Sequence, residues 1–231
     1  MANLNEHILE IRYKPNPKIL DYRGTWAEGI SGHMGLKHWN IVQNRVDVYN
    51  EDSSLQAFVS FKNAGFVALD TQTRDFFPNK ALRFFKYLFS MDGFGKELFV
   101  ERLGVRSTFV QEFKGEFDEL LNKYKTNYLS LTEKASKVID AELVDIGGPL
   151  NFKDKNGNFN TMSGPMKSEQ LSGYFGRSSD KLPDVSLYYD IDSWIRPKKD
   201  LTDREILRKI KAFTEASWDR FINIRDVILG E

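Results

Sequence analysis

Residues 39 to 71 read "WNIVQNRVDVYNEDSSLQAFVSFKNAGFVALDT", and this stretch decides the fold. Its runs at 39–49, 55–61 and 65–71 are rich in β-branched and aromatic residues, as strands are. The short polar segments NEDSS and KNA separate these runs. Because such short connections join antiparallel neighbours, we predict an antiparallel meander here.

The segments around this meander add a strand and two helices. The alternating residues of "HILEIRY", residues 7–13, predict a strand. A helix is predicted from Pro17 to about Ser31, with the proline at its first position. A second helix is predicted over "FPNKALRFFKYLFSMDGFG", because Pro78 stands in its first turn and a glycine follows its end.

The middle of the chain is less regular. Residues 96–113, "KELFVERLGVRSTFVQEF", are too many for a typical strand, and we predict a strand that bends at Gly104. A short helix is predicted over residues 116–124. Residues 137–146, "KVIDAELVDI", then resume a β-like pattern.

The last third predicts a hairpin, a loop, a strand and a long helix. Asn156-Gly157 between β-like residues indicates the hairpin turn, and residues 163–183 are interpreted as a loop. The strand "DVSLYYDID", residues 184–192, is predicted to be central or next to central in the sheet. Thr202 and Glu205 form a capping-box pattern that starts a helix reaching almost to the end of the chain.

Strands grouped together with helices beside them are typical of an α+β fold. We therefore predict a mainly antiparallel sheet with helices packed beside it and a long C-terminal amphipathic helix. A single domain over residues 1–231 is expected. A division into two loosely related halves, about 1–130 and 131–231, stays open.

Composition limits the classes of partner and compartment. The 33 basic residues balance 33 acidic ones, so no global field draws the protein to nucleic acid or to an anionic membrane. The sequence has no cysteine, which suits a reducing cytoplasm. Its start lacks a signal-peptide pattern, and no stretch has the length of a spanning helix. We predict a cytoplasmic protein.

Three stretches resemble a sporadically distributed family of uncharacterised bacterial proteins. They are the opening "ILEIRYKP", the central "ERLGVRSTFV" (residues 101–110), and "LYYDIDSW" (187–194) followed by "SWDRFINI" (217–224). The family has a central R-x-G-x-R run and a strand that ends in an acidic pair before a long helix. Ser107-Thr108 departs from the aromatic residue and asparagine expected there. The resemblance implies an α+β fold with a C-terminal helix, and it implies no activity.

Asp190 and Asp192 are the first candidate site. On a strand they share one face, about 7 Å apart, and could hold a hard cation with a third carboxylate. Asp140, Glu142 and Asp145 are candidates for that third ligand. Aspartates at the end of a strand also accept hydrogen bonds from neighbouring elements, and we favour this structural reading over a metal site.

Basic residues form the second group of candidates. The stretch 196–211 has an excess of positive charge, and it could contact phosphates of nucleic acid or another anion. Arg102 and Arg106 share one strand face and could bind an anion or pair with carboxylates on the next strand. The anion-binding candidates are Arg196, Lys198, Lys199, Arg204, Arg208, Arg102 and Arg106.

The helix over "RDFFPNKALRFFKYLF" has apolar residues beyond one face. Phe84, Tyr87 and Leu88 widen its apolar stripe. Such a helix is either enclosed by its own sheet or shares its outer face with another chain. We predict self-association or a protein partner, with these three residues as interface candidates.

These observations favour a non-catalytic protein-interaction or accessory subunit of a cytoplasmic bacterial system, with no cofactor and no membrane contact. No catalytic constellation is recognised in the sequence. Two alternatives stay open. One is a metal-dependent enzyme acting on phosphate esters through Asp190 and Asp192, and the other is a nucleic-acid-binding protein that uses residues 196–211.

Overall fold

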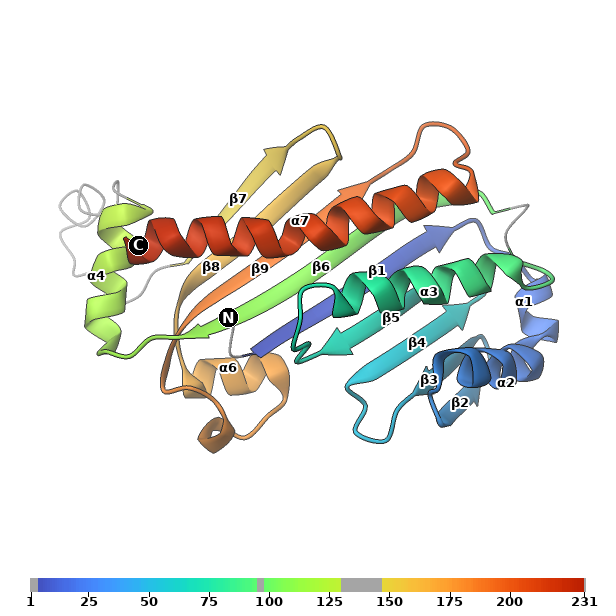
Figure 1. The fold of residues 1–231 in the computed structure, drawn as a ribbon, viewed down its shortest axis with the longest axis horizontal. Helices are drawn as coiled ribbons and strands as arrows, with labels where there is room; N and C mark the ends of the chain where they lie inside the picture. The colour runs from blue at the N-terminus through green and yellow to red at the C-terminus, as the bar shows by residue number, and fades with distance from the viewer. Residues whose placement is uncertain (1–3, 95–97, 130–146, 231) are drawn as a thin grey trace.

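The computed structural model describes residues 4–94, 98–129 and 147–230 (Figure 1). The first part of the chain forms β1 (Leu4–Tyr13), α1 (Lys18–Asp21), α2 (Arg23–Met34), β2 (His38–Val42), β3 (Arg45–Tyr49), β4 (Leu55–Ser60), β5 (Asn63–Leu69) and α3 (Phe76–Ser90). The second part forms β6 (Val100–Glu112), α4 (Phe117–Asn127), β7 (Gly148–Lys153), β8 (Asn158–Lys167), α6 (Ser168–Phe175), a 3-10 turn (Ser179–Lys181), β9 (Val185–Ile195) and α7 (Asp203–Leu229).

The strands form one antiparallel sheet in the order β2-β3-β4-β5-β1-β6-β9-β8-β7. The predicted α+β fold with a mainly antiparallel sheet and a long C-terminal helix is therefore confirmed. The capping box of α7 also forms, because the Thr202 hydroxyl accepts from the Glu205 N–H and the Glu205 carboxylate accepts from the Thr202 N–H. No helix among the described residues is long and apolar enough to cross a membrane.

Four predicted elements differ in the structure. The run 39–49, predicted as one strand, is a hairpin of β2 and β3. Its turn, Gln43-Asn44, contains no glycine or proline that would indicate a turn. The helix expected over 17–31 is divided into α1 and α2. The pairing of strand β6 continues without a register shift through Gly104, which pairs with β1 on one side and β9 on the other. The predicted loop 163–183 contains the end of β8, helix α6 and the 3-10 turn.

Three further predictions concern β9, residues 137–146 and the hairpin at Asn156-Gly157. Strand β9 lies inside the sheet but two strands away from the central β1, so the prediction that it is central or next to central is wrong by one strand. Residues 137–146, with Asp140, Glu142 and Asp145, lie outside the described residues. The hairpin predicted at Asn156-Gly157 is present between β7 and β8.

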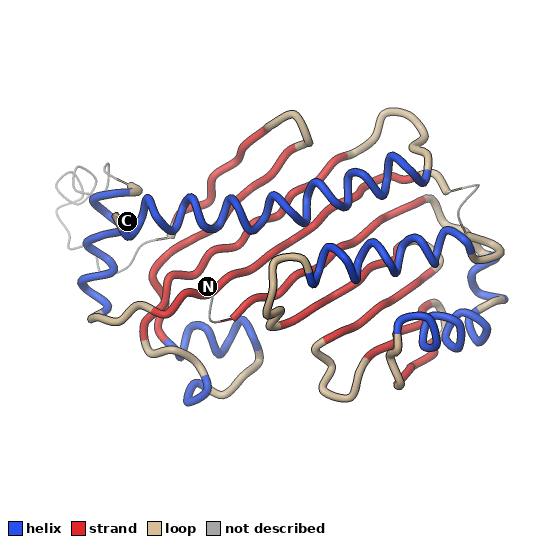
Figure 2. Tube along the Cα trace, in the orientation of Figure 1, coloured by secondary structure: helices blue, strands red, loops and turns tan. Residues whose placement is uncertain are grey.

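Helices α2, α3 and α7 cover one face of the sheet (Figures 1 and 2). Helices α2 and α3 and the start of α7 share a core with β1, β3, β4, β5 and β6. Further along α7, Trp218 and Phe221 pack on Phe109 of β6 and Tyr189 of β9. Helix α6 packs on the opposite face at one end, where Leu171 contacts Val110 and Tyr188. The rest of that face has no helix among the described residues, and we call it the open face.

The element order repeats along the chain. Reading outward from the centre of the sheet, β1, β5, β4 and β3 are followed on the other side by β6, β9, β8 and β7. Each series begins with a strand, continues through a helix and a meander, and ends with a long helix, α3 or α7. The repeat therefore divides between α3 and β6, not near residue 130. Strand β2 has no counterpart among the described residues of the second series.

The apolar residues that widen α3 lie inside the protein. Phe84 and Leu88 are fully buried, and Tyr87 packs on the core with its ring stacked 4.1 Å from that of His33. Helix α3 contacts α2 on one side and α7 on the other, so the helix is enclosed by its own chain. Phe84 and Leu88 are therefore core residues and present no surface to a partner, whereas Tyr87 is half-buried at the edge of the core.

His7 is an unusual member of the core. Its imidazole is 1% exposed, its Nδ1 lies 2.9 Å from the Ser107 hydroxyl, and its ring stacks on Phe77 and meets Trp218. Burial lowers the pKa of His7 to about 3. The folded protein thus holds a neutral imidazole, whereas the unfolded chain binds a proton below about pH 6.5.

We expect the free energy of unfolding to fall as the pH drops from about 6.5 toward 3, because only the unfolded state takes up the proton. The slope for one such group is about 1.4 kcal/mol per pH unit, or about 2 kcal/mol between pH 7 and pH 5. Urea unfolding at these two pH values measures it. His7→Gln should remove most of the difference, and His33→Gln, at a more exposed imidazole, should keep it. Equal slopes in wild type and His7→Gln would refute the assignment.

Candidate functional site

The open face carries rows of charged side chains on its central strands. Residues of β1, β6 and β9 alternate between the two faces, and the positions that point away from the helices include Glu10, Arg102, Arg106, Asp190 and Asp192. Antiparallel pairing places β6 between β1 and β9. The two stretches "ERLGVRSTFV" and "LYYDIDSW" therefore lie side by side.

Asp192 is held by Arg102 across the β6–β9 pair. Arg102 Nη2 lies 3.2 Å from Oδ1 and 2.9 Å from Oδ2 of this carboxylate. The residue directly opposite Asp192 is Arg106, and Arg102 lies four residues from Arg106 along β6, so its side chain reaches Asp192 across Gly104. Burial raises the pKa of Asp192, while the charge of Arg102 acts to lower it. The pair is half-buried and fixes the carboxylate in one orientation.

Asp190 has an equivalent partner in Arg106. Arg106 Nε lies 3.0 Å and 3.1 Å from the two carboxylate oxygens, and Nη2 lies 2.9 Å from Oδ2. The Thr108 hydroxyl donates to the same carboxylate at 3.3 Å. The hydrogen bond to Asp190 raises the pKa of Arg106. Of the two roles considered for Arg102 and Arg106, both residues take the pairing with carboxylates of the next strand.

This arrangement does not suit a divalent cation. A metal at Asp190 and Asp192 would have to displace two guanidinium groups from the carboxylate oxygens, and it would lie among positive charges. Among residues 4–94, 98–129 and 147–230, no group of three or more His, Cys, Asp or Glu side chains is placed to hold a metal ion. The geometry supports a structural role for the two aspartates.

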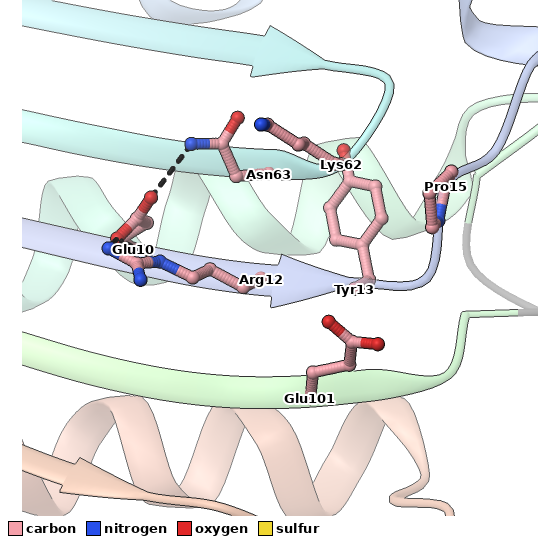
Figure 3. Close-up of a pocket in the computed structure, with 7 residues that line it drawn as sticks. All are labelled: Glu10, Arg12, Tyr13, Pro15, Lys62, Asn63 and Glu101. Carbon is pink, nitrogen blue, oxygen red and sulfur yellow. Dashed lines mark hydrogen bonds and ion pairs between the residues drawn. The ribbon is translucent and has the colours of Figure 1, made fainter.

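A pocket of about 400 Å³ opens beside these ion pairs, where β1 ends (Figure 3). Glu10 lies at its inner end and accepts hydrogen bonds from Arg12 Nε at 2.9 Å and Asn63 Nδ2 at 2.7 Å. Burial acts to raise the pKa of Glu10, but these hydrogen bonds prevail and lower it. Lys62 and Glu101 complete a lining that contains both signs of charge. The pocket fits a polar or zwitterionic group. Of its two carboxylates, that of Glu10 is already hydrogen-bonded.

The basic candidates are divided between two faces. Arg196, Lys198 and Lys199 lie in the connection between β9 and α7. Arg204 and Arg208 lie on the outer side of α7, and with Lys86 of α3 they line a groove of about 590 Å³. Arg102 and Arg106 lie on the opposite, open face. The candidates therefore do not form one continuous basic surface.

Three residues of the site escaped the sequence analysis, namely Glu10, Arg12 and Asn63. The alternation in "ILEIRYKP" contains a usable signal, because Glu10 and Arg12 occupy the phase opposite to Leu9 and Ile11. Their partners could not be identified, because Asn63 lies on β5 and its position opposite Arg12 depends on the strand register.

No protein-family model matches the chain, and no curated protein matches its sequence. The resemblance to the sporadic bacterial family therefore stays a prediction. The residues that carry it, Arg102, Arg106, Asp190 and Asp192, are those that meet across β6 and β9.

Proposed function

We propose that this chain is a non-catalytic interaction protein, an accessory subunit of a cytoplasmic bacterial system, which binds a protein partner on its open face. The observation that carries the proposal is the set of ion pairs on that face. Glu10, Asp190 and Asp192 each accept hydrogen bonds from an arginine or an amide, so none is left to act as a free general base.

The open face has the character of a specific polar interface. Its charges alternate in sign and are ordered by pairing, which favours selection of a partner of complementary pattern. Apolar side chains accompany the charges: Met162 of β8, directly opposite Asp190, is 42% exposed, and Trp194 of β9 is half-buried beside Arg102. Polar pairs around apolar anchors are a common composition of protein interfaces.

The two alternatives receive different support. An enzyme acting on phosphate esters through Asp190 and Asp192 requires that both aspartates release their arginines. Nucleic-acid binding is favoured by one specific observation, the groove between α3 and α7, where Lys86, Arg204 and Arg208 gather. Because Glu205 also lines this groove, its positive field is partly offset.

A recovery experiment separates these functions. The tagged full chain is purified from its own cells in three forms: wild type, Arg106→Ala with Met162→Ala on the open face, and Arg204→Glu with Arg208→Glu in the groove. We expect wild type and the groove variant to recover the same protein partner, and the open-face variant to recover at least about tenfold less, because few central residues dominate an interface. Nuclease treatment should not change the result.

The outcome that supports nucleic-acid binding is the reverse, with recovery lost in the groove variant and sensitive to nuclease. Equal recovery by all three forms would remove the open face as the binding site. Circular dichroism and thermal melting confirm that each variant is folded. The substituted side chains are exposed, and Asp190 keeps the Thr108 hydroxyl as a donor when Arg106 is replaced, so we expect each variant to stay folded.

A further inference from the structure

Strand β2 is an edge strand whose apolar side chains are uncovered. It pairs with β3 on one side, and no described strand lies on the other. Trp39 is 54% exposed and Ile41 is 42% exposed, although they lie opposite Val48 and Val46, which are buried in the core. Trp39 and Ile41 thus extend the apolar layer beneath the helices by one strand, and both side chains stay exposed although α2 contacts this strand.

The two edges of the sheet differ in protection. Exposed edge strands usually carry charges, proline or bulges that prevent pairing with another chain. The far edge, β7, has Pro149 and Lys153. Strand β2 reads HWNIV, with no lysine, arginine, acidic residue or proline, and its register with β3 is uninterrupted. No described strand of the second series is its counterpart.

The register determines which backbone groups of β2 are free. Val42 and Arg45 flank a two-residue turn and are paired, so they hydrogen-bond each other, and the pattern alternates from there. The backbone N–H and C=O groups of His38, Asn40 and Val42 therefore point toward β3. The pairing of β3 with β4 gives the same alternation, because the Asn50 N–H donates to the Leu55 carbonyl at 3.1 Å. The residues of β3 that hydrogen-bond to β4 are therefore not those that hydrogen-bond to β2. It follows that the N–H and C=O groups of Trp39 and Ile41 point away from the sheet.

We propose that a second copy of this chain pairs with β2, antiparallel, about a two-fold axis at Asn40. Trp39 then lies opposite the partner's Ile41, and Ile41 lies opposite the partner's Trp39. Each of these pairs exchanges two backbone hydrogen bonds and joins an aromatic with a β-branched side chain on the apolar layer. Because β2 contains no charged residue, no like charges meet, and the strand is its own complement.

The contact joins the two sheets into one and leaves both open faces accessible. It is therefore independent of the partner-binding role proposed above. A five-residue edge contact is small, so we expect a dissociation constant of about 1–100 µM. Sedimentation velocity on the purified full chain, from below to above this range, should show a 26.8 kDa monomer becoming a dimer.

Ile41→Pro is the sharpest variant. It removes an outward N–H and leaves the bonds between β2 and β3 intact, since proline is tolerated at such edge positions. Each dimer loses two bonds, so we expect dimerisation to weaken by about tenfold or more. Phe152→Lys on β7 is the matched control, because Phe152 is also exposed, at 41%, on the opposite edge, and it should leave the dimer unchanged.

A cross-link tests the register. The chain has no cysteine, so Asn40→Cys introduces a unique thiol on the two-fold axis. Antiparallel residues in a pair without hydrogen bonds have Cα atoms about 4.5 Å apart, which suits a disulfide. Mild oxidation should give a covalent dimer with Asn40→Cys and not with Asn151→Cys on β7.

A chain that stays monomeric to about 500 µM, well above the expected range, or a dimer that resists Ile41→Pro and does not cross-link through Asn40→Cys, would overturn the proposal. So would a monomer whose thiol at position 40 cross-links to a different protein in a cell extract, since β2 would then pair with a foreign strand. All measurements of self-association use purified protein, so their failure leaves the recovery experiment on the open face unaffected.

Discussion

A chain that ends at Leu201 is expected to lose cooperative folding. The missing helix α7 carries six large apolar side chains that are at most 4% exposed: Ile206, Ile210, Phe213, Trp218, Phe221 and Ile228. Each contributes about 1.5–3 kcal/mol by burial, and a domain has a net stability of about 5–15 kcal/mol. The loss therefore exceeds what the rest of the fold can absorb. The measurement is a thermal melt followed by near-ultraviolet and far-ultraviolet circular dichroism.

Point variants in the same helix provide the matched control. Phe221 is fully buried between Phe109 and Tyr189, and Phe221→Ala should lower the free energy of unfolding by about 3–5 kcal/mol. For a chain of this length that corresponds to a melting temperature about 10 °C lower. Val227 is 52% exposed, and Val227→Ala should change stability by less than about 0.5 kcal/mol. A truncated chain that melts cooperatively near the wild-type temperature would contradict the assigned role of α7.

Gly65→Ala is expected to be the most damaging single-methyl change. Gly65 lies in β5 between β1 and β4, and a Cβ at this position would lie 2.5 Å from the Leu9 carbonyl oxygen and 2.4 Å from Cζ of Phe58. The Phe58 ring lies over the glycine and is itself covered by the Arg45 guanidinium at 4.1 Å. The ring can move only by giving up this contact, and the carbonyl belongs to the central strand.

We expect Gly65→Ala to lower the free energy of unfolding by about 3 kcal/mol, at the upper end of the usual cost of overpacking. Gly32→Ala in α2 is the opposite case, because an added Cβ there meets no atom within 4 Å. That variant should stabilise the protein by about 0.5–1 kcal/mol, since alanine favours the helix. Urea denaturation compares the pair directly. If Gly65→Ala and Gly32→Ala shift the free energy of unfolding in the same direction, the close approach at Gly65 does not explain why glycine stands at this position.

Elements with local signals were predictable from the sequence. The start of α7 follows from Thr202 and Glu205, three residues apart, and the β7–β8 hairpin follows from Asn156-Gly157. The β2–β3 hairpin was missed because Gln43-Asn44 carries no such signal. Helix α6 was missed because Gly164-Pro165 before it indicates a loop, whereas both residues belong to β8. Pro165 is tolerated there because β7 stops pairing at Ser163.

The candidate site was predictable in its parts and not in its assembly. The sequence identifies Arg102 and Arg106 as one strand face and Asp190 and Asp192 as another, but the pairing between them depends on a register set by contacts along the whole of β6 and β9. The same limit applies to Phe84. A wide apolar helix fits either a partner or its own chain, and the choice depends on α2 and α7 flanking α3.

The central position of β1 has a consequence for synthesis on the ribosome. Its pairing with β5 joins residues such as Arg12 and Asn63, whereas its pairing with β6 reaches from Leu4 to Val110. A nascent chain that has emerged only through β5 therefore presents one bare edge of its central strand until β6 follows. Helix α7, which closes the core over β6, leaves the ribosome only after β9. Because unpaired edges promote aggregation, this interval is the stage at which nascent chains should depend most on chaperones.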